Sequence, residues 1–552
     1  MKTDIEIAQE CRLNNIEDVA STYIEESELY RYGKEVAKVP YDYHSDYPEN
    51  GKLILVTAMT PTKSGEGKTT VSVGLIDAMN RLGYRTVGCL RQPSFGPVFG
   101  MKGGAAGGGY SQVVPMEKLN LGLTGDLDAI TSANNLLAAM IDNHIFQGNE
   151  LGIDVNRIVW KRCLDVCDRS LRSATIKIGK KSDNTSYEAH FDITAASEIM
   201  TIMVLSKNID ELKERLGNIT VAYSRTGEPV YARQLKAEGA MTAILREAFN
   251  PNILQTLEHN PVFVHCGPFA NISLGTNSIV CTKLGLRVSD YVVTEAGFAS
   301  DLGAEKFFDI KCRVGNLNPA CTVLVTTVKA LRYHGGGEEN IPSEDAVVSG
   351  LSNLRAHIDN LRSVFNQKVV VALNRFSDDT EEEILLIKYF CQLNKVPFAV
   401  STAFLNGGEG ATELAELIVN ECNTPEQSLN YSYSNWESIS DRIENVVRNV
   451  YHASDIEWDF SAHESLVSLY GGPETVTDHF VCIAKTQYSF SDDAKKLNDP
   501  RNYTIRIRDI EKKTGAGLTI VHCGNIVTMP GLPKVPNAEK IDYVSGKIVG
   551  LS

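Results

Sequence analysis

A loop of small residues between an apolar run and a helical stretch constrains this chain more than any other feature of its sequence. The run Leu53–Val56 is typical of a strand that is buried in a parallel sheet. Apolar side chains on one stripe predict a helix over Lys68–Leu82, and a second strand is expected over Thr86–Leu90. Strand, loop, helix and strand in this order predict a βαβ unit.

The loop has the residue types that bind phosphate. Its small residues let backbone N–H groups converge on an anion, and the N-terminus of the following helix adds partial positive charge. Lys68 is placed to reach the outer phosphates of a nucleotide, and the Thr69 hydroxyl to ligate Mg²⁺. The alternative is an ordinary glycine-rich turn, because Thr62 stands where the usual phosphate-loop pattern has glycine. We expect ATP to bind the set Thr60, Thr62, Gly65, Glu66, Gly67, Lys68, Thr69 and Thr70.

Short apolar runs recur along the rest of the chain, and helical segments separate most of them. This alternation predicts an α/β protein with a doubly wound, mostly parallel sheet that contains the phosphate loop (P-loop). A length of 552 residues predicts two or three domains. The further runs lie at 262–264, 291–293, 322–325, 369–371 and 398–400, and strand-like runs near the end lie at 503–508 and 518–522.

The charge and hydropathy of the chain exclude some classes of partner. A net charge of −15 argues against non-specific nucleic-acid binding, which needs a basic surface. No run of eighteen apolar residues occurs, so no membrane partner is expected. The first residues include acids where a signal peptide needs an apolar stretch. Twelve cysteines are scattered without a metal-like cluster, so we expect a cytoplasmic location, where thiols stay reduced.

Two features lie close to the expected phosphate site. Arg91 directly follows the second strand, at the edge where ligands bind in open α/β sheets, and an arginine there can neutralise an acyl phosphate. A surface arginine is the alternative. The glycine-rich run at 103–109 suits close approach of the backbone to an anion or to another backbone, or else forms a flexible loop.

Together these residues resemble the formate–tetrahydrofolate ligase family, and the resemblance runs essentially from end to end. It implies that ATP is used to join formate to tetrahydrofolate through formyl phosphate, with release of ADP and phosphate. It also implies catalytic roles for Lys68, Arg91 and Gln92, and a pterin held between Phe376 and Phe404, which otherwise fit simple core packing. Besides the Thr60–Thr70 loop, the resemblance rests on stretches 93–100, 102–110, 134–144, 191–198, 267–272, 294–298, 301–313, 407–410 and 528–534.

The resemblance further implies an assembly and a domain plan. A homotetramer and activation by a monovalent cation, K⁺ or NH₄⁺, are expected. We predict a P-loop nucleotide-binding domain at 1–355, an α/β folate-binding domain at 356–454 and a small C-terminal domain at 455–552.

Several residues depart from the family pattern. Gln92 stands in place of Glu, an amide that cannot act as a base. Two interpretations stay open: a working ligase that tolerates the changes, or a diverged paralogue with another one-carbon or small acyl donor or another acceptor. A non-catalytic folate or nucleotide sensor is a third, and the presence of Lys68, Thr69 and Arg91 counts against it. The other departures are Gly122, Asp128, Phe146, Leu274, Thr276, Ser377 and Asn525.

Overall fold

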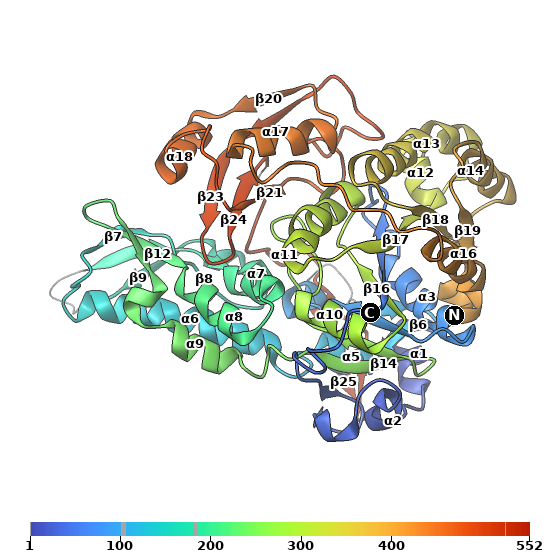
Figure 1. Ribbon diagram of the computed structural model, residues 1–552, viewed down its shortest axis with the longest axis horizontal. Coiled ribbons are helices and arrows are strands. Elements are labelled where there is room, and N and C mark those ends of the chain that lie inside the picture. The colour runs from blue at the N-terminus through green and yellow to red at the C-terminus, as the bar shows by residue number, and fades with distance from the viewer. Residues whose placement is uncertain (1, 101–105, 180–184, 525, 552) are drawn as a thin grey trace.

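A large mixed sheet organises the chain (Figure 1). The computed structural model describes residues 2–100, 106–179, 185–524 and 526–551, and twelve strands of this part form the sheet. Neighbours are parallel throughout its central path. In spatial order this path is β15 (Pro261–Val264), β4 (Thr86–Leu90), β16 (Tyr291–Glu295), β3 (Lys52–Ala58), β17 (Pro319–Thr326), β18 (Val369–Asn374) and β19 (Phe398–Ser401).

The remaining strands extend one side of this path with antiparallel pairing. Strand β14 (Asn252–Thr256) pairs antiparallel with β15, with β2 (Ala37–Lys38) and with β6 (Ser111–Val114). Strand β1 (Tyr30–Arg31) pairs with β2, and β5 (Gly107–Gly108) with β6. The predicted α/β class is confirmed, and so are the seven central strands; the antiparallel side was not predicted.

Alternating side chains bury both faces of the sheet. In β3, Leu53 and Leu55 belong to one hydrophobic cluster, and Ile54 and Val56 belong to another. The first cluster includes residues of α10 (Ile279–Val288), α12 (Val328–His334) and α13 (Glu344–Asp359). The second includes residues of α3 (Lys68–Arg81) and α16 (Thr412–Cys422). Burial on both faces explains why the central strands are apolar without alternation.

A separate lobe is inserted between β6 and β14, and its buried apolar residues belong to a third hydrophobic cluster, which also includes Ile279, Cys482 and Leu518 from later parts of the chain. It extends from the sheet at the left of Figure 1. Its strand β7 has the sequence Ile-Asp-Val-Asn-Arg-Ile. Because polar residues interrupt the apolar ones, no continuous apolar run predicts this strand. The lobe contains α6 (Asp126–Phe146), β7 (Ile153–Ile158), α7 (Glu198–Leu205), α8 (Ile209–Gly217), β12 (Thr220–Ser224), β13 (Pro229–Tyr231) and α9 (Glu238–Leu245).

The predicted boundary near residue 355 does not coincide with a break in the sheet. It falls inside α13, and β18 and β19 continue the sheet beyond β17. The division at this point therefore stays a prediction. The C-terminal segment carries small sheets of its own (Figure 1), with β20 (Asp455–Trp458) on β22 (Thr504–Ile507), and β21 (Phe480–Ala484), β24 (Leu518–His522) and β23 (Asp509–Lys513) in a second one. Helices α17 (Ile439–Asn449) and α18 (Phe460–Tyr470) pack with them. Within the described ranges, no helix is long and apolar enough to cross a membrane.

Candidate active site at the carboxyl edge of the sheet

The predicted site residues gather at one edge of the parallel sheet. Parallel strands end together, and six neighbouring strands each place a polar or aromatic group just at or beyond the last residue. Ligands bind at this edge in open α/β sheets. In spatial order these groups are Arg91 and Gln92 after β4, Glu295 on β16, the loop from Thr60 after β3, Thr327 after β17, Phe376 after β18 and Phe404 after β19.

The loop between β3 and α3 depends on two glycines with left-handed backbone. Gly65 has φ +81° and Gly67, the cap residue of α3, has φ +71°. A Cβ on Gly67 would lie 2.3 Å from Nδ2 of Asn374, which donates a hydrogen bond to the Glu66 carbonyl. A side chain at Gly67 would therefore strain the backbone and displace the Asn374 amide.

Glu66 holds the loop from its buried side. Its carboxylate accepts hydrogen bonds from the Thr62 N–H (2.8 Å) and from the Thr327 hydroxyl. Burial raises the pKa of Glu66, although these two bonds oppose the rise. Among the expected ATP ligands, Glu66 and Thr62 are thus engaged inside the loop, and Thr60 is buried with partners of its own.

Lys68, Thr69, Arg91 and Glu295 form a charged group at the N-terminus of α3. The Thr69 hydroxyl donates to one oxygen of Glu295 (2.8 Å), and Arg91 donates to the other (3.3 Å). Burial lowers the pKa of Lys68 to about 8, while the Glu295 carboxylate acts in the opposite direction. Glu295 is 2% exposed, and the sequence analysis did not single it out as a site residue.

Gln92 has a buried side-chain amide. Its backbone N–H donates to the Cys266 carbonyl (2.7 Å), and this hydrogen bond fixes the backbone of the residue that follows Arg91. Its side-chain nitrogen and oxygen, like Nε of Arg91, are buried and find no hydrogen-bond partner in the described part of the chain. Buried polar atoms are normally paired, so these atoms can serve a small polar ligand.

Phe376 and Phe404 lie at the ends of two adjacent strands, and both are partly buried. The ammonium group of Lys329 is 4.6 Å from the centre of the Phe376 ring. Gly108 and Gly109 lie against Phe404, where a Cβ on Gly109 would be 2.0 Å from the Phe404 carbonyl oxygen. The glycine-rich run therefore approaches another backbone, as one of the alternatives predicted; its residues 103–105 lie outside the described ranges.

The other departures from the family pattern lie in varied surroundings. Leu274 is fully buried in the hydrophobic cluster of the lobe. Gly122 has φ +101° with open space around it, Asp128 is exposed in the first turn of α6, and Phe146 is 47% exposed at the end of that helix. Asn525 lies outside the described ranges. Gln92 is the departure that lies beside Arg91.

A second concave region lies away from these groups. A cavity of about 1500 Å³ lies between the lobe and the C-terminal segment and is lined among others by Lys161, Glu198, Phe460, Glu511 and Lys513. None of the predicted site residues lines it. Among the described residues, no group of three or more His, Cys, Asp or Glu side chains is arranged to hold a metal.

Comparison with known proteins identifies the family of the chain. The family model described as formate–tetrahydrofolate ligase matches residues 2–552. A formate–tetrahydrofolate ligase of Pelagibacter ubique is 48% identical over 564 residues, which cover 100% of this chain and 99% of the relative. A protein of the same name from Campylobacter concisus is 49% identical over 559 residues, with full coverage of both chains. The resemblance predicted from the sequence is thereby confirmed, and the chain belongs to the formate–tetrahydrofolate ligase family.

Proposed function

We propose that the carboxyl edge of the parallel sheet is where this ligase uses ATP to join formate to tetrahydrofolate. The observation that carries the proposal is the group Lys68, Thr69, Arg91 and Glu295 beside the loop of α3. We interpret the loop as a P-loop in a doubly wound sheet. Lys68 and the N-terminus of α3 bind the outer phosphates of ATP.

The residues present suit a magnesium ion. The Thr69 hydroxyl and the Glu295 carboxylate are oxygen ligands of the kind that Mg²⁺ prefers, and they lie next to the lysine that we assign to the phosphates. Bound there, Mg²⁺ would neutralise charge on the phosphate oxygens. Activation by K⁺ or NH₄⁺ stays a prediction from the family, without an assigned residue.

Arg91 and Gln92 fit the formyl phosphate. In the first step an oxygen of formate attacks the γ-phosphorus of ATP and ADP leaves. The Arg91 guanidinium offsets the charge of the two anions, and the Gln92 amide donates a hydrogen bond to the formyl group. In the second step N10 of tetrahydrofolate attacks the formyl carbon and phosphate leaves.

Phe376 and Phe404 are proposed to hold the pterin between their rings. Their places at the ends of neighbouring strands put them on the same edge as the phosphate loop. Two flat apolar faces suit a planar heterocycle. A homotetramer, expected from the family resemblance, and a cytoplasmic location complete the proposal.

Two lysines of the same loop provide a matched test of the phosphate assignment. Lys68→Ala removes the ammonium group beside Glu295, whereas Lys63→Ala removes an exposed one a few residues away. We expect Lys68→Ala to lower kcat/KM for ATP by at least about a hundredfold, as loss of a main electrostatic contact does. Lys63→Ala should stay within threefold of the wild type. Equal activity of the two variants would refute the assignment.

A further inference from the structure

Thr60, the first residue of the phosphate loop, is held by two histidines. Its N–H donates to Nε2 of His357 (2.9 Å), and its carbonyl accepts a hydrogen bond from Nε2 of His334 (3.0 Å). Its hydroxyl lies 2.9 Å from the same His357 nitrogen and accepts from Nδ2 of Asn353 (3.0 Å). The N–H, carbonyl and hydroxyl of Thr60 are all occupied within the protein, so this residue anchors the loop.

The surrounding bonds fix each imidazole in one neutral tautomer. A carbonyl oxygen can only accept, so His334 carries its proton on Nε2, and its Nδ1 accepts from the Asn498 N–H (3.1 Å). His357 accepts on Nε2 and therefore donates from Nδ1 to the Ser300 hydroxyl (2.7 Å). Burial lowers the pKa of His334 to about 4 and that of His357 to about 3.

Both histidines are contacted by one stretch of the C-terminal domain, residues 485–499. Asn498 supplies the N–H that binds His334, and its carbonyl accepts from Asn353 (2.6 Å). The Phe490 ring packs on the His357 imidazole, with 4.5 Å between the ring centres. Segment 485–499 thus contacts every side chain that holds the backbone of Thr60.

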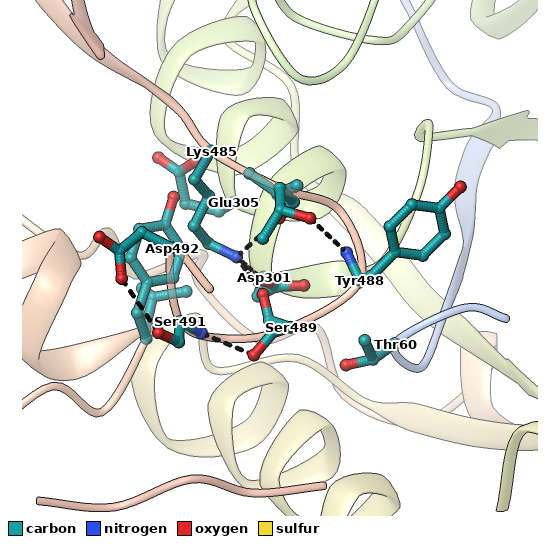
Figure 2. Close-up of polar contacts among 12 residues, drawn as sticks. Thr60, Asp301, Glu305, Lys485, Tyr488, Ser489, Ser491 and Asp492 are labelled. Atoms are coloured by element: carbon teal, nitrogen blue, oxygen red, sulfur yellow. Dashed lines mark hydrogen bonds and ion pairs between the residues drawn. The ribbon is translucent and has the colours of Figure 1, made fainter. Parts of the chain in front are cut away.

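The beginning of this segment is itself fixed by a buried ion pair. Lys485 donates to Asp301 (2.8 Å) and to the Ser489 carbonyl (2.5 Å), and Figure 2 shows its ammonium group directed at Asp301. Asp301 follows Ser300, the partner of His357. The ion pair therefore connects the segment to the element that orients His357.

We propose that segment 485–499 positions the phosphate loop for ATP through His334 and His357, which act as positioning residues. The inference rests on the assignment of the loop to the phosphates of ATP. The loop must hold its N–H groups and Lys68 in one arrangement before the nucleotide binds. Thr60 fixes the start of the loop, just after β3. The C-terminal domain thereby contributes to ATP affinity without touching the nucleotide.

The test compares substitutions at His357 by direct binding of MgADP, measured by calorimetry. His357→Leu removes the nearer of two acceptors of the Thr60 N–H and leaves only Oδ1 of Asn353 at 3.3 Å. We expect the Kd to rise about tenfold, in line with the loss of a buried hydrogen bond. His357→Gln offers an amide oxygen as acceptor and should restore most of the affinity. Phe490→Leu keeps an apolar side chain but loses the ring that packs on the imidazole, and should raise the Kd in the same direction.

His479→Leu is the matched control. Like His357, His479 is a buried neutral histidine, but it lies in the C-terminal domain and bonds to Tyr470 and not to Thr60. It should lower the melting temperature and leave the Kd unchanged. The KM for tetrahydrofolate should stay within twofold in all four variants. His357→Leu and Phe490→Leu proteins that bind MgADP as the wild type does would overturn the proposal. Unchanged MgADP affinity in Lys68→Ala would instead refute the phosphate assignment itself.

Discussion

Glu295 accepts hydrogen bonds from Thr69 and Arg91, so one carboxylate connects the N-terminus of α3 to the arginine that follows β4. Arg91 is partly exposed, whereas Glu295 is almost fully buried, so the pair is less screened by water than a surface ion pair. The charge of Arg91 is therefore oriented before a ligand binds. This residue-scale arrangement favours an anionic intermediate at this place.

Replacement of Gln92 by leucine separates function from stability. The amide is buried and has no hydrogen-bond partner among the described residues, which costs about 1–3 kcal/mol of stability. Gln92→Leu should therefore leave the melting temperature equal or higher, and raise the KM for formate at least about tenfold because a hydrogen bond to the ligand is lost. Thermal unfolding and steady-state kinetics measure both.

Gln112→Leu is the control for Gln92. Gln112 is equally buried, but its Nε2 donates to the carbonyls of Asp4 and Gly109, so its loss should destabilise the protein without changing the KM for formate. A Gln92→Leu protein with lower stability and an unchanged KM would show that Gln92 is only a packing residue.

Lys68 predicts a pH dependence of nucleotide binding. Burial lowers the pKa of Lys68 to about 8, so its charge is present below pH 8 and is lost above it. Under the proposed role of Lys68, ATP binds the charged form, so the affinity for ATP should be constant below about pH 8 and fall by up to about tenfold per pH unit above it. Lys68→Arg stays charged and should show a flat profile from pH 7 to 9.5. Parallel profiles of the two proteins would assign the titration to another group.

At the scale of elements, the loops after parallel strands bring the site together. The strand, loop, helix and strand over 52–90 could be predicted because each piece has a local signal: an apolar run, glycines and helical periodicity. The pairing of β16 with β3 and β4 could not be predicted, because β16 lies far from both strands in the sequence. Glu295 therefore had no local signal, since an acid at the end of an apolar run also fits a surface turn.

A substitution at Gly109, between β5 and β6, tests whether this turn holds Phe404 in place. An alanine at this position would bring Cβ to 2.0 Å from the Phe404 carbonyl at a left-handed φ of +57°. Gly109→Ala should shift Phe404 and raise the KM for tetrahydrofolate about fivefold or more, as loss of an aromatic contact does. The KM for ATP should not change.

Gly83→Ala controls for backbone strain, because Gly83 has φ +87° with open space around it. Gly83→Ala should lose about 1–2 kcal/mol of stability from the left-handed backbone alone. Gly109→Ala should lose more, because its Cβ also meets the Phe404 backbone, and only this variant should change folate kinetics. The same KM for tetrahydrofolate in both variants would show that Phe404 does not contact the folate.

At the scale of the whole molecule, the buried apolar residues form three hydrophobic clusters, and each contains residues from distant parts of the chain. One cluster includes residues of the sheet together with Ile483 and Ile505 of the C-terminal segment. Composition alone could not reveal this, because each segment has its own strands and helices. Packing of this kind lets a distant segment reach the phosphate loop.

The measurement that tests the central claim most directly is a product assay with the wild-type protein. Protein, MgATP, tetrahydrofolate, formate and K⁺ are mixed, the mixture is acidified, and the methenyl-tetrahydrofolate chromophore is read. We predict that the chromophore forms only when formate and ATP are both present, which means that an edge with Gln92 beside Arg91 supports formate ligation. Absence of product while ATP and tetrahydrofolate still bind would contradict the account and favour another acyl or one-carbon donor.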